Sequence, residues 1–312
     1  MKIRVLGSAA GGGFPQWNCN CRNCSGVRLG TLRTRQRSQS SIAIRGSAAH
    51  ANPQVQLHDW TLVNASPDIL HQLASNALQP GRTIRDSGIA AIVLTDSQID
   101  HVTGLFMLRE ATSAWEIWCT DSVHRDLTGG NPVLSVLTHY CGSEHKRMQL
   151  GERFTPGVQA DLAFTALELQ SKPPPYSPNR SMPKFDDNVA LRIVDTAGGG
   201  RLLYAPGLGA MSEPLWQAML ASDCVLVDGT FWTDDEMIQL GLSKRTARDI
   251  GHLPQTGAGG MLEWLTRLPA ATRKILIHIN NTNPILDEDS PERALLSARG
   301  IEVAHDGMEI DL

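Results

Sequence analysis

The sequence predicts an α/β protein, in which strands and helices alternate along the whole chain. Short apolar runs rich in β-branched residues stop abruptly at polar residues, which is typical of buried strands. Stretches with helical spacing separate these runs, and this order favours sheets that are flanked by helices. The predicted strands include residues 3–7, 60–63, 91–94, 114–119, 189–194, 201–205, 225–228 and 274–277, and the predicted helices include 69–76, 105–109 and 255–268.

Bulk properties exclude several classes of partner. The chain has 312 residues and a formal net charge of −4, with a pI of about 6.2. It has no long run of Lys or Arg, so a nucleic-acid partner is not expected. The first apolar run is too short for a signal peptide, and no stretch approaches the roughly 20 apolar residues of a membrane span. We therefore expect a cytoplasmic protein without a membrane span.

A proline-rich stretch at residues 172–183 interrupts the regular pattern. The prolines around Tyr176 exclude a helix or a central strand there. Because strands resume directly afterwards, a long loop over the active-site face is favoured over an interdomain linker. The whole chain, residues 1–312, is thus predicted to form a single domain.

Three of the six cysteines lie close together in the sequence. Cys19, Cys21 and Cys24 form a Cys-x-Cys-x-x-Cys cluster. Three thiolates at this spacing suit one tetrahedral Zn²⁺, and three soft ligands without an open substrate position indicate a structural site. The alternative is a set of unrelated buried thiols, which have no reason to cluster on a turn. The sequence therefore predicts a zinc-binding loop at about residues 17–26.

Polar residues at two strand ends indicate a functional site. His278 leaves the last apolar strand into a run of asparagines, which is unusual for plain core packing. Imidazoles and carboxylates in such places are candidate metal ligands. The alternative is a polar turn that merely leaves a strand. The residues that follow the strand at 91–94 include Thr95, Asp96, Gln98, Asp100 and His101.

This last segment resembles the metal-binding loop of metallo-β-lactamase-fold proteins, Thr-His-x-His-x-Asp-His-x-x-Gly. His278 coincides with the final metal histidine of that superfamily. The resemblance extends over nearly the whole chain and implies the αββα sandwich, two mixed β-sheets flanked by helices. The matching residues are Thr95, Asp100, His101 and Gly104, whereas Asp96 and Gln98 stand where the family has two further histidines.

The same resemblance reveals departures from a two-metal hydrolase. Asn64 stands where relatives end a strand with aspartate, and Gly207 stands where relatives have the aspartate that bridges two metals. Without that carboxylate, the usual two-metal clamp is not expected. Asp228 and Thr230 match a conserved strand of the relatives, and Asp228 is either a carboxylate that supports the ligands or a turn residue at a strand end.

The cysteine cluster resembles that of phosphodiesterases of this superfamily that carry an extra zinc. In those relatives a histidine close to the C-terminus completes the site, and Asn281 stands at that position here. The fourth ligand is therefore left open. Further motifs, Cys-Asn-Cys-x-Asn-Cys, Thr-Asp-Ser-Gln-Ile-Asp-His, Tyr-Ala-Pro-Gly and His-Ile-Asn-Asn-Thr-Asn-Pro, resemble the coenzyme PQQ synthesis protein B family. That family belongs to the route that makes pyrroloquinoline quinone (PQQ) from a cross-linked Glu and Tyr.

The resemblance implies that Asp100, His101 and His278 hold a metal, with Asp96 a candidate further ligand. Two histidines and one carboxylate with open positions are typical of non-haem Fe²⁺ oxygen chemistry. A single Zn²⁺-bound hydroxide uses a similar set, so ligand type leaves the metal open. The implied pathway favours oxygen chemistry, because the tyrosine-derived ring must gain oxygen to become an ortho-quinone.

The leading hypothesis is an iron-dependent oxygenase that hydroxylates the ring of the Glu-Tyr-derived intermediate. One alternative is a non-enzymatic carrier that binds PQQ or its precursor and assists its transfer towards the periplasm. Another is a zinc hydrolase. The residues expected to orient water, oxygen or substrate are Asp96, Gln98, Asn64 and His252.

The expected partner is a small molecule, PQQ or its precursor, and a homodimer is the assembly we consider. His124, His139 and His145 are expected to be surface histidines. For three arginines in the N-terminal part a solvated edge is favoured, and contacts to the substrate's carboxylates are the alternative. These arginines are Arg33, Arg35 and Arg37.

Overall fold

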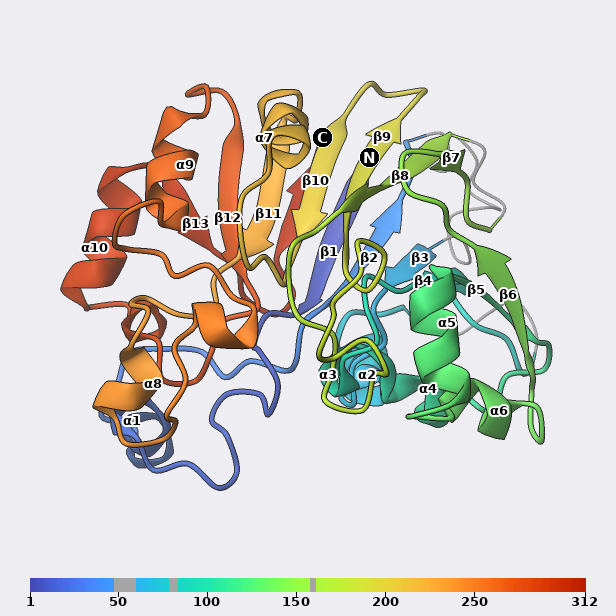
Figure 1. The fold of residues 1–312 in the computed structure, drawn as a ribbon, viewed down its shortest axis with the longest axis horizontal. Coiled ribbons are helices and arrows are strands. Elements are labelled where there is room, and N and C mark those ends of the chain that lie inside the picture. The colour runs from blue at the N-terminus through green and yellow to red at the C-terminus, as the bar shows by residue number, and fades with distance from the viewer. Residues whose placement is uncertain (48–59, 79–83, 158–160) are drawn as a thin grey trace.

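The computed structural model describes residues 1–47, 60–78, 84–157 and 161–312. In this part of the chain, two seven-stranded mixed sheets pack face to face, with helices on their outer sides. Figure 1 shows α9 and α10 (orange to red) outside one sheet and α5 and α6 (green) beside the other. The predicted αββα arrangement is therefore confirmed. No helix among the described residues is both long and apolar enough to cross a membrane.

The first sheet joins both ends of the chain. Its first three strand pairs are antiparallel and its last three are parallel. In spatial order its strands are β14 (Glu309–Asp311), β1 (Lys2–Gly7), β2 (Ser41–Arg45), β3 (Trp60–Val63), β4 (Ile89–Val93), β5 (Trp115–Cys119) and β6 (Ser143–Arg147).

The second sheet has the same mixture of directions. Its pairs from β13 to β10 are parallel and those from β10 to β7 are antiparallel. In spatial order its strands are β13 (Ile301–Val303), β12 (Arg273–Ile277), β11 (Cys224–Asp228), β10 (Arg201–Ala205), β9 (Val189–Asp195), β8 (Leu162–Glu168) and β7 (Arg153–Phe154).

Short helices cover the outer faces and the strand ends. They are α1 (Arg22–Leu29), α2 (Ile69–Ser75), α3 (Ile99–Val102), α4 (Gly104–Met107), α5 (Asp121–Thr128), α6 (Val133–Leu137), α7 (Glu213–Leu220), α8 (Glu236–Gln239), α9 (Met261–Arg267) and α10 (Pro291–Ala298), with 3₁₀ turns η2 (Arg248–Ile250) and η3 (Pro284–Leu286).

The middle positions of central strands such as β4 and β11 are apolar because both of their faces are buried. Val93 points between the sheets, whereas its neighbour Ile92 packs under the helices of the first sheet. Likewise Leu226 points between the sheets and Val225 packs towards the helices of the second. Burial on both faces gives continuous apolar runs instead of alternation, which is why these strands were visible in the sequence.

Two helix predictions were wrong in their bounds. The helix predicted at 255–268 begins only at Met261, because Gly257 and Gly259 adopt left-handed backbone angles that break regular helix. The helix predicted to begin at 105–109 is preceded by α3, so that Asp100 and His101 lie in a helical turn. Gly104 joins α3 to α4, and a Cβ there would lie 2.2 Å from the carbonyl oxygen of Ser66.

The three histidines expected at the surface lie away from the strand ends that carry the polar residues. His139 is exposed. His124 lies on α5 and His145 lies on β6, where a loop or helix was expected, and their rings stack at 4.0 Å. Neither belongs to a group of side chains that could hold a metal among the described residues.

Candidate metal centre

Polar residues from both sheets converge at one edge of the sandwich. The segment after β4 leads into α3, which carries Asp100 and His101, whereas His278 directly follows β12 in the other sheet. Each of these strands runs parallel to its neighbours within its own sheet, and the residues that follow the two strands lie close together. Such strand ends are the usual location of sites in α/β proteins.

Asp100, His101 and His278 form a group that could hold one ion. Their ligand atoms all lie within 4.8 Å of one another. Asp100 Oδ2 lies 3.2 Å from His278 Nε2 and 3.9 Å from His101 Nε2. The two imidazole rings meet edge to face, with centroids 5.2 Å apart. The geometry thus brings together the three residues that the sequence predicted as ligands.

Asp96 supports His101 from behind. Both carboxylate oxygens of Asp96 lie 2.8 Å from His101 Nδ1. With the proton on Nδ1, the lone pair of Nε2 faces Asp100, and Nε2 is buried without a hydrogen-bond partner among the described residues. A buried nitrogen left unpaired is costly unless an ion or donor satisfies it, so the arrangement fits a metal at Nε2. Asp96 orients this histidine, as carboxylates do behind zinc ligands.

A second network fixes His278 and His252 through Thr230. Asp228 is fully buried and accepts a hydrogen bond from His252 Nδ1 at 2.7 Å. The Thr230 hydroxyl lies 2.6 Å from the other oxygen of Asp228 and 2.9 Å from His278 Nδ1. If the hydroxyl donates to the carboxylate, it accepts from His278, and both imidazoles keep their Nε2 lone pairs free. Asp228 therefore supports the site, which decides between its two sequence interpretations.

The pKa of His101 depends on the two carboxylates beside it. Burial alone would lower the pKa of His101, but the carboxylates of Asp96 and Asp100 outweigh it and raise the pKa to about 9. Burial would raise the pKa of Asp100, yet His101 and His278 hold it well below its ordinary value. The site is thus arranged to stabilise positive charge between carboxylates, which also suits a divalent cation.

Two residues at these strand ends have strained backbones. His278 and Asn64 both have a φ of 61°, in the left-handed region that non-glycine residues rarely adopt. Asn64 does not face the metal ligands: its buried amide bonds the Thr95 backbone N–H and hydroxyl, each at 3.0 Å. The expectation that Asn64 orients water or substrate is therefore wrong, and it instead holds the turn that follows β4.

A cavity of about 420 Å³ opens onto the three ligands. Gly207 lines it, and a Cβ at this position would meet nothing within 4 Å, so the missing carboxylate leaves open space. Gln98 also lines the cavity and donates to the carbonyl of Lys172 at 3.0 Å, which fastens the proline-rich loop to the site. His252 completes this wall with its ring stacked on that of His278, at 5.4 Å between centroids.

The arginines that the sequence suggested do not reach this cavity. Arg33 pairs with Glu288 and Asp289, at 3.5 and 3.1 Å. Arg35 lies 3.9 Å from Glu288, and Arg37 is buried and donates to the carbonyl of Ala304. Among the described residues, the arginines that line the cavity are instead Arg180 and Arg245. The side chain of Asn188 lines it as well. Their contribution was not visible in the sequence, although Arg180 belongs to the proline-rich stretch already singled out.

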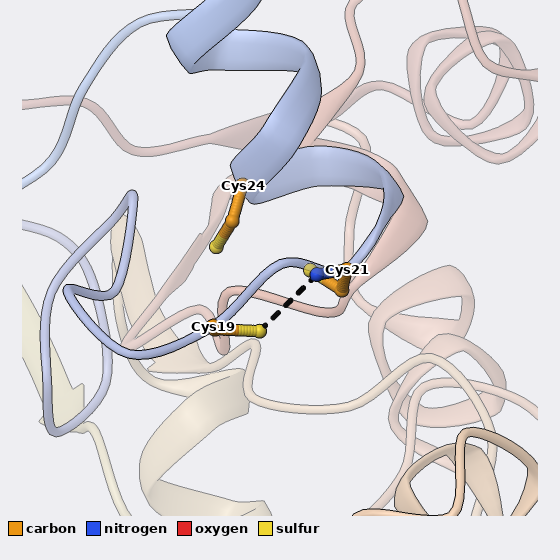
Figure 2. Close-up of side chains that lie close together, drawn as sticks. All are labelled: Cys19, Cys21 and Cys24. Carbon is orange, nitrogen blue, oxygen red and sulfur yellow. Dashed lines mark hydrogen bonds between the residues drawn. The ribbon is translucent and has the colours of Figure 1, made fainter.

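The side chains of Cys19, Cys21 and Cys24 lie close together in space (Figure 2). All three are free thiols, and their sulfur atoms lie within 4.8 Å of one another. Asn281 points into the cluster, with Nδ2 3.1 Å from Cys19 Sγ and 3.3 Å from Cys24 Sγ. Burial raises the pKa of Cys21 to about 11. The residue at the expected position of a fourth ligand therefore faces the sulfurs, and a bound cation would favour the thiolate form.

Glu236 is a buried carboxyl beside the cluster that the sequence did not reveal. It accepts hydrogen bonds from the Trp232 backbone N–H at 2.7 Å and from Thr282, the neighbour of Asn281. Burial raises the pKa of Glu236 from the ordinary 4.5 to about 7. Folding therefore favours its protonated form.

The raised pKa of Glu236 predicts that the stability of the protein depends on pH. Its contribution is complete below pH 4.5 and is lost as the pH rises through about 7. We expect Glu236→Gln to remove this loss, so that the variant gains up to roughly 3 kcal/mol over the parent protein between pH 5 and pH 8.5. The free energy of unfolding in urea, measured at pH 5 and at pH 8.5, tests this prediction. Glu152→Gln is the control because Glu152 is exposed. Parallel pH profiles of the parent and Glu236→Gln would contradict the prediction.

Comparisons with known proteins identify the family of this chain. Residues 59–279 match the beta-lactamase superfamily domain. A coenzyme PQQ synthesis protein B from Azoarcus sp. (strain BH72) is 58% identical, and one from Azotobacter vinelandii (strain DJ / ATCC BAA-1303) is 56% identical, each over 100% of both chains.

Two solved structures are also similar to this chain. The Zn²⁺-bound PqqB from Methylobacterium extorquens is 37% identical, covers 100% of both chains and superposes with a TM-score of 0.88. A diphosphatase of the PhnP family shares the fold, with a TM-score of 0.67 at 16% identity. On this evidence, the chain belongs to the coenzyme PQQ synthesis protein B family of the β-lactamase superfamily.

Proposed function

We propose that this chain acts in PQQ biosynthesis as an iron-dependent oxygenase that hydroxylates the tyrosine-derived ring of the Glu-Tyr intermediate. The observation that carries the proposal is the group of Asp100, His101 and His278, in which a buried Nε2 of His101 has no partner among the described residues. The family name supports the pathway, and a zinc-bound relative supports a metal in the family. The choice of iron rests on the pathway, in which the tyrosine-derived ring must gain oxygen, and a ligand set of two histidines and one carboxylate is compatible with it.

The residues divide into holding and positioning roles. Fe²⁺ at this centre would supply the activation of oxygen. Asp96 keeps the proton of His101 on Nδ1, so that Nε2 is available as a ligand. Thr230 does the same for His278. His252, oriented by Asp228, presents its other nitrogen as a candidate acid or base for the phenol of the substrate.

Hydroxylation has a definite balance of atoms and electrons. One atom of O₂ enters a ring C–H bond to give C–OH, and the other leaves as water after uptake of two electrons and two protons. The electrons must come from an external two-electron reductant, such as ascorbate in an assay. Zinc cannot serve this step because Zn²⁺ has no redox chemistry.

A two-metal hydrolase is the less supported alternative. Gly207 supplies no bridging carboxylate, and among the described residues the second candidate group, Asp228, His252 and His278, shares its histidine with the first. In that group, Asp228 and His252 already bond each other at 2.7 Å. A second ion would have to break this pair.

The test is an anaerobic loading experiment. The apoprotein receives Fe²⁺ or Zn²⁺, then the Glu-Tyr cross-linked amino acid, ascorbate and finally oxygen, while product mass and oxygen uptake are followed. We expect the mass of one oxygen atom to be gained per hydroxylation with Fe²⁺ and none with Zn²⁺. Tight binding without mass change under either metal would favour the carrier function. Release of a small acid or amine with Zn²⁺ would favour the hydrolase.

A further inference from the structure

The cavity beside the metal centre carries an unneutralised positive charge. Among the described residues that line it, the carboxylates are Asp96 and Asp100. A divalent cation at the centre would offset both of them. Arg180 and Arg245 then remain. Within the described chain neither lies within ion-pair distance of a carboxylate, although Arg245 interacts electrostatically with the exposed Asp249. Two cations in a wall of this kind attract an anionic ligand.

Arg180 is held in place by the loop that carries it. Its guanidinium donates to the carbonyl of Pro173, which leaves most of its donors free. The loop is fastened by Tyr176 to the carbonyl of Ser97 and by Ser177 to Asp126, the latter at 2.9 Å. Because the loop is anchored just ahead of this arginine, little freedom is lost when a ligand binds.

Asn188 adds a second, independent sign of a ligand. It is only 4% exposed and lines the cavity, yet its Nδ2 has no hydrogen-bond partner among the described residues. A buried amide left unpaired is rare in proteins and requires a reason. With Nδ2 turned towards the cavity by rotation about the last side-chain bond, the amide would donate to a ligand oxygen.

We propose that Arg180 and Asn188 form a carboxylate-binding subsite that positions the substrate in this cavity. The inference rests on the proposed function for its substrate: a Glu-Tyr adduct carries two carboxylates from the glutamate and one from the tyrosine. The planar guanidinium pairs with a carboxylate through two parallel hydrogen bonds, and the amide donates a third. Arg245, which is exposed at the rim, contributes charge without this anchoring.

Binding to the Zn²⁺-loaded protein under nitrogen tests the subsite without any turnover. The probes are the free Glu-Tyr adduct and its trimethyl ester, measured by calorimetry. We expect Arg180→Gln to weaken binding of the free acid roughly 10- to 100-fold, the effect of a lost hydrogen bond to a charged group. The ester should lose less than about threefold, because it has no carboxylate to lose.

Further variants separate this role from a structural one. Arg180→Lys keeps the charge without the fork and should restore only part of the affinity. Asn188→Ala should weaken binding of the acid several-fold and leave the ester unchanged. Arg192→Gln is the matched control, since Arg192 is exposed on β9 and does not line the cavity.

Three results would overturn the subsite: equal losses for acid and ester in Arg180→Gln, unchanged binding of the acid, or no binding of either probe by the parent protein. Displacement of the acid by millimolar inorganic phosphate with equal affinity for acid and ester would instead indicate a phosphate site. Acid-selective binding that depends on Arg180, without oxygen uptake in the iron-loaded protein, would keep the subsite and reject the oxygenase.

Discussion

The His101→Ala protein is expected to fold but to lose its active-site metal and its oxygen uptake. His101 supplies the buried Nε2 that completes the group with Asp100 and His278. Structural zinc sites bind with about 10–16 kcal/mol shared among four ligands, so one ligand is worth roughly 3–4 kcal/mol, or two to three orders of magnitude in affinity. At micromolar iron the site should be largely empty, and turnover should fall in proportion.

Metal analysis after gel filtration and oxygen uptake with the Glu-Tyr adduct measure this result. His139→Ala is the control, because His139 is an exposed histidine outside both candidate groups. Asp96→Asn should give an intermediate loss of about 10- to 100-fold, typical of a residue that orients a ligand. Full metal content and full uptake in His101→Ala would show that the ion lies elsewhere.

The parts of the site that the sequence predicted are those that follow apolar strands. His278 directly follows β12, and Asp100 and His101 lie on the first helix after β4. An abrupt change from a buried run to polar residues is a local signal, so the position of these side chains followed from the fold class. The resemblance to a known loop then identified them as ligands.

The parts that the sequence missed depend on contacts between distant segments. Arg33 finds its partners at Glu288 and Asp289, far along the chain, and no local pattern distinguishes such pairing from a substrate contact. Arg180 reaches the cavity only because the proline-rich loop folds back over Gln98. Asn64 was expected at the site because the resemblance places it where relatives end a strand with aspartate, but its backbone is left-handed and its amide bonds Thr95.

One segment ties the two predicted metal sites together. His278 and Asn281 lie three positions apart in the same turn, which Asn283 fastens to the carbonyl of Gly229 at 2.9 Å. From the other side, Asn23 of the cysteine loop donates to the carbonyls of Asn281 and Asn283, at 3.1 and 2.9 Å. A cation bound by the cysteines would therefore stabilise the strained position of His278.

We accordingly expect Cys19→Ser to remove one zinc per chain and to weaken metal binding at His278 as well. Serine preserves the size of this partly exposed side chain but is a poor zinc ligand, so lost packing adds little. The folding energy that the ion supplies should disappear, lowering the thermal midpoint on the order of 10 °C. Zinc binding to the parent protein should release protons, because the pKa of the Cys21 thiol is about 11 without the ion.

Cys141→Ser is the matched control, since Cys141 is also a partly exposed free thiol but lies outside the cluster. It should keep the zinc content and thermal midpoint of the parent protein. A chelator should lower the midpoint of the parent protein to that of Cys19→Ser. Retention of both zinc content and midpoint in Cys19→Ser would mean that the thiols merely pack together, whereas loss of zinc without weaker metal binding at His278 would confine the cluster's role to its own loop.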